Sequence, residues 1–167
     1  MGIEIERKFL VTDARWREGA SRSVRMAQGY INDMAALRDA RQNASVRVRI
    51  AGDAAFLNLK SREPGHTRQE FDYAIPVADA EALLALCVGG RIDKLRHYVV
   101  HAGHTWEVDE FAGDNAGLVV AELELASADE AFERPAWLGR EVTDETRWYN
   151  LALAERPYSR WSAQEKT

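Results

Sequence analysis

The stretch Glu4-Ile5-Glu6-Arg7-Lys8 places two carboxylates and an ammonium group at every second position near the start of the chain. Successive side chains of a β-strand point to opposite faces of a sheet, so a strand here directs Glu4, Glu6 and Lys8 to one face and Ile5 and Arg7 to the other. An ordinary solvated sheet face also alternates charged and apolar residues. Taken alone, this segment favours that simpler interpretation.

The same alternation returns in later segments, and most of them carry pairs of charges of one sign. These segments are Val46-Arg47-Val48-Arg49-Ile50, Glu70-Phe71-Asp72-Tyr73 and Glu122-Leu123-Glu124-Leu125. Like charges two residues apart on a strand repel each other, so a ligand of opposite charge must compensate them. Carboxylate oxygens suit Mg²⁺ or Mn²⁺, and arginine forks match phosphate oxygens. The sorting by sign therefore predicts a combined metal and phosphate site.

Length and composition set the frame for this site. A chain of 167 residues with 46% hydrophobic residues predicts one domain, residues 1–167. The net charge of −5 argues against a surface that coats nucleic acid, so the bases that bind a polyanion must be gathered locally. The single cysteine, Cys87, excludes an internal disulfide and a zinc thiolate cluster. No run approaches the roughly 18 apolar residues that span a bilayer, and the acidic start does not resemble a signal peptide, which predicts a cytoplasmic protein.

Short alternating segments separated by turn signals predict eight strands, near residues 3–11, 24–31, 45–51, 55–61, 68–75, 92–101, 104–111 and 118–126. Such a series favours antiparallel hairpins that close into a barrel or a strongly curved sheet over about residues 1–126. Helical spacing over residues 77–88, ending at Gly89-Gly90, predicts a helix outside the sheet. Residues 128–132 and 146–155 predict a helical C-terminal part over about 127–160. Residues 33–43 are compatible with a helix or a long loop.

The histidines and tryptophans have no pattern of a ligand site. His66, His97, His101 and His104 lack the spacing of a zinc site and are expected at the surface or in turns. The tryptophans are expected to pack helices against the exterior of the barrel.

The order of the charged segments resembles the CYTH family, also called triphosphate tunnel metalloenzymes, whose N-terminal signature is Glu-x-Glu-x-Lys. The matching segments cover nearly the whole chain: Glu4 to Lys8, Gln28-Gly29-Tyr30, Val46 to Arg49, Leu59-Lys60, Glu70 to Asp72, Lys94-Leu95-Arg96, Glu107 to Phe111, Glu122 to Glu124 and Gly139 to Thr143. The chain most resembles short bacterial members that carry this domain alone.

The resemblance implies an α+β fold, an eight-stranded antiparallel β-barrel with charged side chains lining a tunnel and helices packed outside. The implied triphosphate-binding set is Lys8, Arg47, Arg49, Lys60, Lys94 and Arg96. The implied ligands of Mg²⁺ or Mn²⁺ are Glu122, Glu124 and Asp109 for a first metal, Glu4 and Glu6 for a second metal or the attacking water, and Glu70. Asp72, one methylene shorter than the glutamate of many relatives, is expected to reach a metal only through water. A salt bridge with a tunnel cation is the alternative for each carboxylate.

The resemblance also implies catalysis of phosphoryl transfer, which needs positioning and charge neutralisation more than covalent help. Tyr30 matches a family tyrosine close to a tunnel lysine, and Lys60 is its expected partner. The ammonium group would lower the pKa of Tyr30 or fix its hydroxyl against the terminal phosphate. A buried tyrosine with a satisfied hydroxyl is the alternative. Lys94 is a further candidate for the catalytic cation, and the sequence does not rank these residues.

The favoured activity is metal-dependent hydrolysis of inorganic triphosphate to pyrophosphate and phosphate. Hydrolysis of nucleoside or thiamine triphosphate comes second, and class IV adenylyl cyclase activity third, because no base-binding pocket is evident in the chain. A protein that binds triphosphate or polyphosphate without turnover is disfavoured by the number of carboxylates. The expected partner is a small-molecule triphosphate, with no membrane, and a homodimer is left open.

Overall fold

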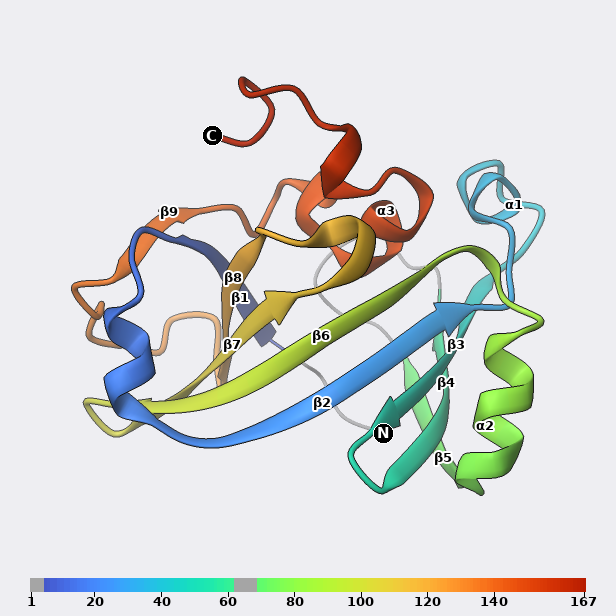
Figure 1. The fold of residues 1–167 in the computed structure, drawn as a ribbon, viewed down its shortest axis with the longest axis horizontal. Helices are drawn as coiled ribbons and strands as arrows, with labels where there is room; N and C mark the ends of the chain where they lie inside the picture. Colours follow the sequence, from blue (N-terminus) through green and yellow to red (C-terminus); the bar gives the residue numbers. More distant parts are fainter. Residues whose placement is uncertain (1–4, 62–68) are drawn as a thin grey trace.

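Nine strands form one antiparallel sheet in the computed structural model, which describes residues 5–61 and 69–167. The strands are β1 (Ile5–Val11), β2 (Ala20–Tyr30), β3 (Ala44–Ala51), β4 (Ala54–Ser61), β5 (Glu70–Ile75), β6 (Val88–His101), β7 (His104–Phe111), β8 (Val119–Leu125) and β9 (Leu138–Glu141). Their order across the sheet is β5-β4-β3-β2-β6-β7-β8-β1-β9 (Figure 1). Each of the eight predicted segments corresponds to a strand, and β9 is the additional one.

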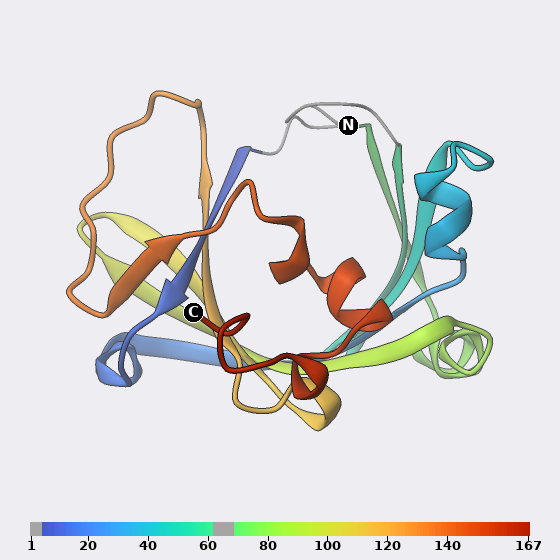
Figure 2. The same ribbon diagram turned by 90° about the horizontal axis from the view of Figure 1, so that it is seen from above.

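The sheet bends into a U-shaped trough, with β4 and β5 on one arm and β1 and β8 on the other (Figure 2). The predicted antiparallel tunnel architecture is confirmed, with two corrections. The described part of the chain contributes nine strands rather than eight, and these strands do not close into a barrel. The reason lies in β1, which pairs with β8 on one side and with the short strand β9 on the other. At Phe9 and Val11 the second edge of β1 is therefore occupied by β9 and not by β5.

Helix α2 (Val77–Leu84) lies outside the trough, as predicted. Its Ala80 is fully buried against Val48 and Ala55, which point away from the trough. Helix α1 (Met34–Arg38) occupies part of the undecided segment, and the Asp33 side chain caps it by accepting a hydrogen bond from the Ala35 amide. The helix expected over residues 128–132 is wrong, because this segment forms a turn followed by irregular chain.

Helix α3 (Asn150–Glu155) corrects the expectation that all helices pack outside. Its Leu153 is fully buried together with Trp148, Ile92 and Val120. Ile92 and Val120 face the inside of the trough, so α3 covers the inner face at one end of the sheet (Figure 2). These apolar side chains must be removed from water, and only a segment inside the trough can do this. Trp161 packs in the same cluster, so the predicted exterior position is also wrong for Trp148 and Trp161.

Four short 3₁₀ helices complete the described elements: η1 (Arg15–Gly19), η2 (Gly113–Asn115), η3 (Thr146–Trp148) and η4 (Tyr158–Arg160). Trp16 of η1 packs against His97 on the outer face of the sheet, with ring centroids 4.7 Å apart. His97 is only 7% exposed; its Nδ1 lies 2.7 Å from the Ser23 hydroxyl and its Nε2 lies 3.3 Å from Glu110. The expected surface position of His97 is therefore wrong, and its role is to attach η1 to the sheet.

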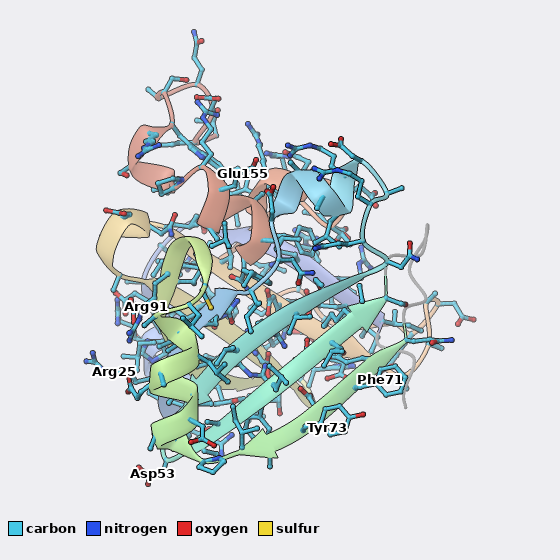
Figure 3. All side chains as sticks on the ribbon, turned by 90° about the vertical axis from the view of Figure 1, so that its right-hand side faces the viewer. Arg25, Asp53, Phe71, Tyr73, Arg91 and Glu155 are labelled. Carbon is cyan, nitrogen blue, oxygen red and sulfur yellow. The ribbon has the colours of Figure 1, made fainter. Side chains whose placement is uncertain are left out.

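The edge strand β5 directs Phe71 and Tyr73 away from the trough, and both are exposed there (Figure 3). The alternating residues Glu70 and Asp72 point into the trough, so one strand separates its acids from its aromatic rings. Within residues 5–61 and 69–167, no helix has the length and apolar character needed to cross a membrane.

Candidate active site

Strand register places the predicted charged residues on the inner face of the trough. Residues directly opposite each other on antiparallel strands point to the same face. The opposed pairs are Lys8 with Glu122, Glu6 with Glu124, Glu107 with Glu122, Arg96 with Asp109, Lys94 with Met26, Arg49 with Gln28, Arg47 with Tyr30 and Asn58, and Lys60 with Glu70. Every predicted site residue except Glu4 thus shares one face, and Glu4 lies outside the described residues.

One arm of the trough, formed by β6, β7, β8 and β1, is rich in carboxylates; we call it the acidic wall. The Arg96 guanidinium is at its centre. Its Nε and Nη2 atoms donate to the two oxygens of Asp109, each at 2.7 Å. Nη2 also lies 2.7 Å from Glu122 Oε2, and Nη1 donates to Glu107. Three carboxylates from two neighbouring strands therefore converge on one guanidinium group.

Two buried lysines complete the charge balance of the acidic wall. Lys8 Nζ lies 2.5 Å from Glu122 Oε1 and 4.2 Å from the centre of the Tyr149 ring. Burial would lower the pKa of Lys8, but Glu122 and Glu6 outweigh it and raise this pKa to about 12. Lys94 Nζ donates to Asp109, and burial lowers the pKa of Lys94 in spite of this carboxylate. Burial would raise the pKa of Glu122, yet Lys8, Arg96 and Lys94 lower it, so Glu122 is ionised at neutral pH.

Glu6 and Glu124 form the rim of the acidic wall. They stand directly opposite each other on β1 and β8, and both are exposed to the trough. Neither makes an ion pair or a hydrogen bond with a side chain of the described residues. The protein that surrounds the trough partly desolvates the Glu6 carboxyl group, and this effect, followed by the charge of Glu122, raises the pKa of Glu6 to about 7. Opposed like charges destabilise a sheet, so this rim is suited to a cation.

The other arm, formed by β3, β4 and β5, presents Arg47, Arg49 and Lys60; we call it the basic wall. Lys60 Nζ lies 3.1 Å from Glu70 Oε2, and Arg47 Nη2 lies 3.9 Å from Glu70 Oε1. The buried Asn58 donates to Glu70 and, at 2.9 Å, to Asp72 Oδ1. Glu70 thus contacts cations of its own wall, which matches the salt-bridge alternative considered for the carboxylates.

Among the six predicted cations of the trough, Arg49 alone forms no ion pair with a carboxylate of the described residues. The Nε atoms of Arg47 and Arg49 are buried and have no hydrogen-bond partner in the described part of the chain. Burial lowers the pKa of Arg49, and the neighbouring Arg47 adds to this effect. The Arg49 guanidinium lies 5.6 Å from the centre of the Phe56 ring, a contact that adds little against the repulsion. An anion placed between these two guanidinium groups would satisfy both.

Tyr30 lies beside the basic wall, where its hydroxyl accepts a hydrogen bond from Gln28 Nε2 at 3.2 Å. Burial raises the pKa of Tyr30, although Arg47 and Lys8 act in the opposite direction. The predicted lowering of this pKa is therefore not found, and the hydroxyl stays protonated as a donor. Gly29 lies between Gln28 and Tyr30. A side chain is disfavoured at this position because its Cβ atom would lie only 2.7 Å from the Cys87 sulfur. Glycine at this position lets residue 87 pack against β2.

Three residues of the trough were missed from the sequence as site residues. Glu107 contacts Arg96, Asn58 holds Glu70 and Asp72, and Gln28 donates to Tyr30. The period-two alternation contained a signal for all three, since Glu107 precedes Asp109, Asn58 precedes Lys60, and Gln28 precedes Tyr30 by two positions. Asn58 and Gln28 are uncharged, so the sorting of charges by sign did not identify them as site residues.

The donor set of the acidic wall fits a divalent cation. It consists of carboxylate oxygens, the ligands that Mg²⁺ and Mn²⁺ prefer, and Glu6 and Glu124 stand opposed without a bound partner among the described side chains. Over the ranges that the structure describes, no three acidic, histidine or cysteine side chains are arranged as ready metal ligands. The three carboxylates that do converge surround Arg96 instead.

The sheet is concave, and its acidic wall faces its basic wall. This arrangement is typical of proteins that bind an anion together with metal cations. The sequence model described as the CYTH domain matches residues 2–156. The chain therefore belongs to the CYTH family, and the resemblance seen in the charged segments is confirmed.

Individual relatives extend this assignment. The chain is 43% identical over 159 residues to an inorganic triphosphatase of Acetivibrio thermocellus, covering 95% of this chain and 97% of the relative. It is 38% identical over 154 residues to an inorganic triphosphatase of Nitrosomonas europaea, covering 90% and 96%. A crystal structure of an inorganic triphosphatase superposes with a TM-score of 0.69 at 35% identity, covering 92% of this chain and 95% of that one.

Proposed function

We propose that this protein hydrolyses inorganic triphosphate to pyrophosphate and phosphate with the help of Mg²⁺ or Mn²⁺. The observation that carries the proposal is the pair Arg47 and Arg49. Each has a buried Nε without a hydrogen-bond partner in the described chain, and the pair faces an acidic wall suited to divalent cations. The relatives named inorganic triphosphatase, with 38% and 43% identity over nearly the whole chain, support the same reaction.

The basic wall would bind the triphosphate. Arg47 and Arg49 offer guanidinium groups that match phosphate oxygens, and Lys60 adds an ammonium group beside them. On the acidic wall Arg96, Lys8 and Lys94 supply further positive charge. Lys8 and Lys94 are 1% and 3% exposed, so these two act on the substrate mainly through their charge, whereas Arg96 has a guanidinium at the trough surface.

The metal would be held by acids of the acidic wall, namely Glu6, Glu124, Glu122 and Asp109. Glu4 is a further predicted ligand, and Glu70 is a predicted ligand on the basic wall. A bound divalent ion neutralises phosphate oxygens and orients a water molecule. The protein itself has to hold the chain of phosphates in line with that water, and the opposed walls do this. The choice between Mg²⁺ and Mn²⁺ stays a prediction.

Tyr30 would donate its hydroxyl proton in a hydrogen bond to a phosphate oxygen. The hydroxyl is protonated, already accepts a hydrogen bond from Gln28 and lies beside Arg47. Water attacks the terminal phosphorus, the bond to the bridging oxygen breaks, and pyrophosphate leaves with the electron pair of that bond. A donor at a phosphate oxygen stabilises the charge of this transition state. Lys60, whose ammonium group pairs with Glu70, and Lys94 are the other predicted catalytic residues.

The test is a comparison of phosphate release from inorganic triphosphate, ATP and thiamine triphosphate, each with Mg²⁺, with Mn²⁺ and with EDTA. We expect the fastest release from inorganic triphosphate with a divalent ion and none with EDTA. Arg25→Met serves as a matched control, because Arg25 lies on the outer face of the neighbouring strand β2 and should leave the rate unchanged (Figure 3). Cyclic AMP formed from ATP without released phosphate would establish a cyclase instead, and binding without turnover would establish a binding protein.

A further inference from the structure

Arg96 differs from the other cations of the trough in the number of acids that it holds. Lys8 pairs with Glu122, and Lys94 pairs with Asp109. Arg96 contacts both of these carboxylates and Glu107 as well. Among the described residues it is the one cation that joins all three. The guanidinium therefore uses carboxylate oxygens that a divalent ion would need as ligands.

The position of Arg96 also distinguishes it from the two lysines. The side chains of Lys8 and Lys94 are each 2% exposed, whereas that of Arg96 is 11% exposed and borders the trough. Its charge is close enough to Arg49 to contribute to the lowered pKa of that residue. Arg96 already borders the trough, so it is the cation of the acidic wall that can turn toward an anion on the basic wall. The two lysines would first have to leave their buried positions.

We propose that Arg96 is an exchangeable counter-ion: without metal its guanidinium neutralises Glu107, Asp109 and Glu122, and it moves to phosphate oxygens when metal and triphosphate enter together. The inference rests on the proposed function. A guanidinium and a divalent cation repel each other and compete for the same oxygens, so each hinders the other until an anion accepts the guanidinium. The metal alone then binds weakly, and metal and triphosphate strengthen each other's binding.

The exchange gives the trough a way to stay folded in the absence of ligand. Lys8 and Lys94 pair with Glu122 and Asp109, but without Arg96 the three carboxylates would repel each other more strongly and Glu107 would contact no cation of the described residues. Arg96 prevents this because its planar fork donates to Asp109 through two nitrogens and to the other two acids at the same time. A lysine has a single nitrogen and cannot span the three acids in this way.

The test is calorimetric titration of Mn²⁺ alone, without any phosphate, into the metal-free full chain. The variants are Arg96→Met, Arg96→Lys and, as the control, Arg25→Met, with circular dichroism to establish that each is folded. We expect Arg96→Met to bind Mn²⁺ at least tenfold more tightly than the wild type, Arg96→Lys to fall between them, and Arg25→Met to equal the wild type. For Arg96→Met, turnover of triphosphate should fall while metal affinity rises.

Equal Mn²⁺ affinities of folded Arg96→Met and wild type would overturn the exchange. Should Arg96→Met not fold, Arg96→Lys decides: affinity equal to that of the wild type overturns the proposal, and tighter binding supports it. The proposed function is judged separately by triphosphate hydrolysis in the wild type. An active wild type with an unchanged metal affinity in the variants would remove only the exchange. An inactive wild type whose Arg96→Met variant binds Mn²⁺ more tightly would remove the hydrolase and leave the competition between Arg96 and the metal.

Discussion

The two walls of the trough differ in how their charges are satisfied. On the acidic wall, Arg96, Lys8 and Lys94 each contact a carboxylate. On the basic wall, Arg49 has a buried Nε without a partner in the described chain and stands beside a second arginine. The cations of the acidic wall are thus all paired with carboxylates, whereas Arg49 on the basic wall is not. We infer that the paired cations of the acidic wall stabilise the fold, whereas the buried charge of Arg49 costs stability in the unliganded protein.

The largest effect should come from breaking the acidic wall with Glu122→Gln. Glu122 joins Lys8 and Arg96, so its neutral replacement leaves a lysine buried without its carboxylate. We expect turnover of triphosphate to fall by about 100-fold or more, since a metal ligand and a counter-ion are lost together. The variant should also unfold at a lower temperature, with a loss of roughly 3 kcal/mol.

The matched control is Glu110→Gln, on the outer face of β7, where Glu110 contacts Arg17 and His97. Steady-state rates with Mn²⁺ and thermal unfolding would be measured for both variants. Activity of Glu122→Gln within threefold of the wild type would show that the acidic wall does not hold the catalytic metal through this residue.

The next effect should come from the basic wall, with the opposite sign for stability. Arg49→Met removes a charge that burial and Arg47 disfavour, so the unliganded variant should unfold at a higher temperature than the wild type. The KM for triphosphate should rise by roughly tenfold or more, because a charged hydrogen-bond donor to phosphate is lost. Thermal unfolding without ligand and steady-state kinetics give the two readouts. A variant that is less stable than the wild type would refute the contrast between the walls, and Arg25→Met again controls for loss of a positive charge.

Tyr30→Phe should have a smaller effect, because it removes one neutral hydrogen bond. A loss of about 0.5–1.5 kcal/mol corresponds to a fall in kcat of roughly two- to twelvefold. Because the pKa of Tyr30 is raised, the hydroxyl should not titrate in the working range, and the pH dependence of kcat should keep its shape in the variant. A new or missing limb in that pH profile below pH 9 would instead indicate that Tyr30 acts as a base.

Much of this contrast could be predicted from sequence, because period-two alternation fixes which side chains share a face once a strand exists. Arg47 and Arg49, or Glu122 and Glu124, were placed together for this reason. Register across strands was not predictable, since it depends on long-range pairing. Sequence therefore did not reveal that Arg96 lies opposite Asp109 or that Glu6 lies opposite Glu124.

The C-terminal part was harder to predict for a different reason. Strand β9 has four residues and is held by β1, so its own sequence carries little strand signal. Helix α3 lies inside the trough because Ile92 and Val120 need cover at that end, a demand that comes from two distant strands. The position of β9 and that of α3 are therefore determined by distant strands and cannot be inferred from the sequences of these two segments. The series of strands and turns allowed a barrel or a strongly curved sheet, and the family resemblance implied the closed barrel. The pairing of β1 with β9 was not visible in either.

The smallest effect concerns the rim of the acidic wall, where Glu6 faces the trough. Its pKa of about 7 lies above the ordinary 4.5 because burial and Glu122 disfavour the charge. Stability from this group is present below pH 4.5 and is lost as the pH rises through about 7. In EDTA, Glu6→Gln should therefore unfold about 2 °C above the wild type at pH 8 but not at pH 4.5. Glu81→Gln, on the exposed side of α2, is the control. The unfolding temperatures of Glu6→Gln and the wild type would be measured at both pH values. A difference between the two proteins that is the same at pH 4.5 and pH 8 would show that charge repulsion at Glu6 does not destabilise the rim.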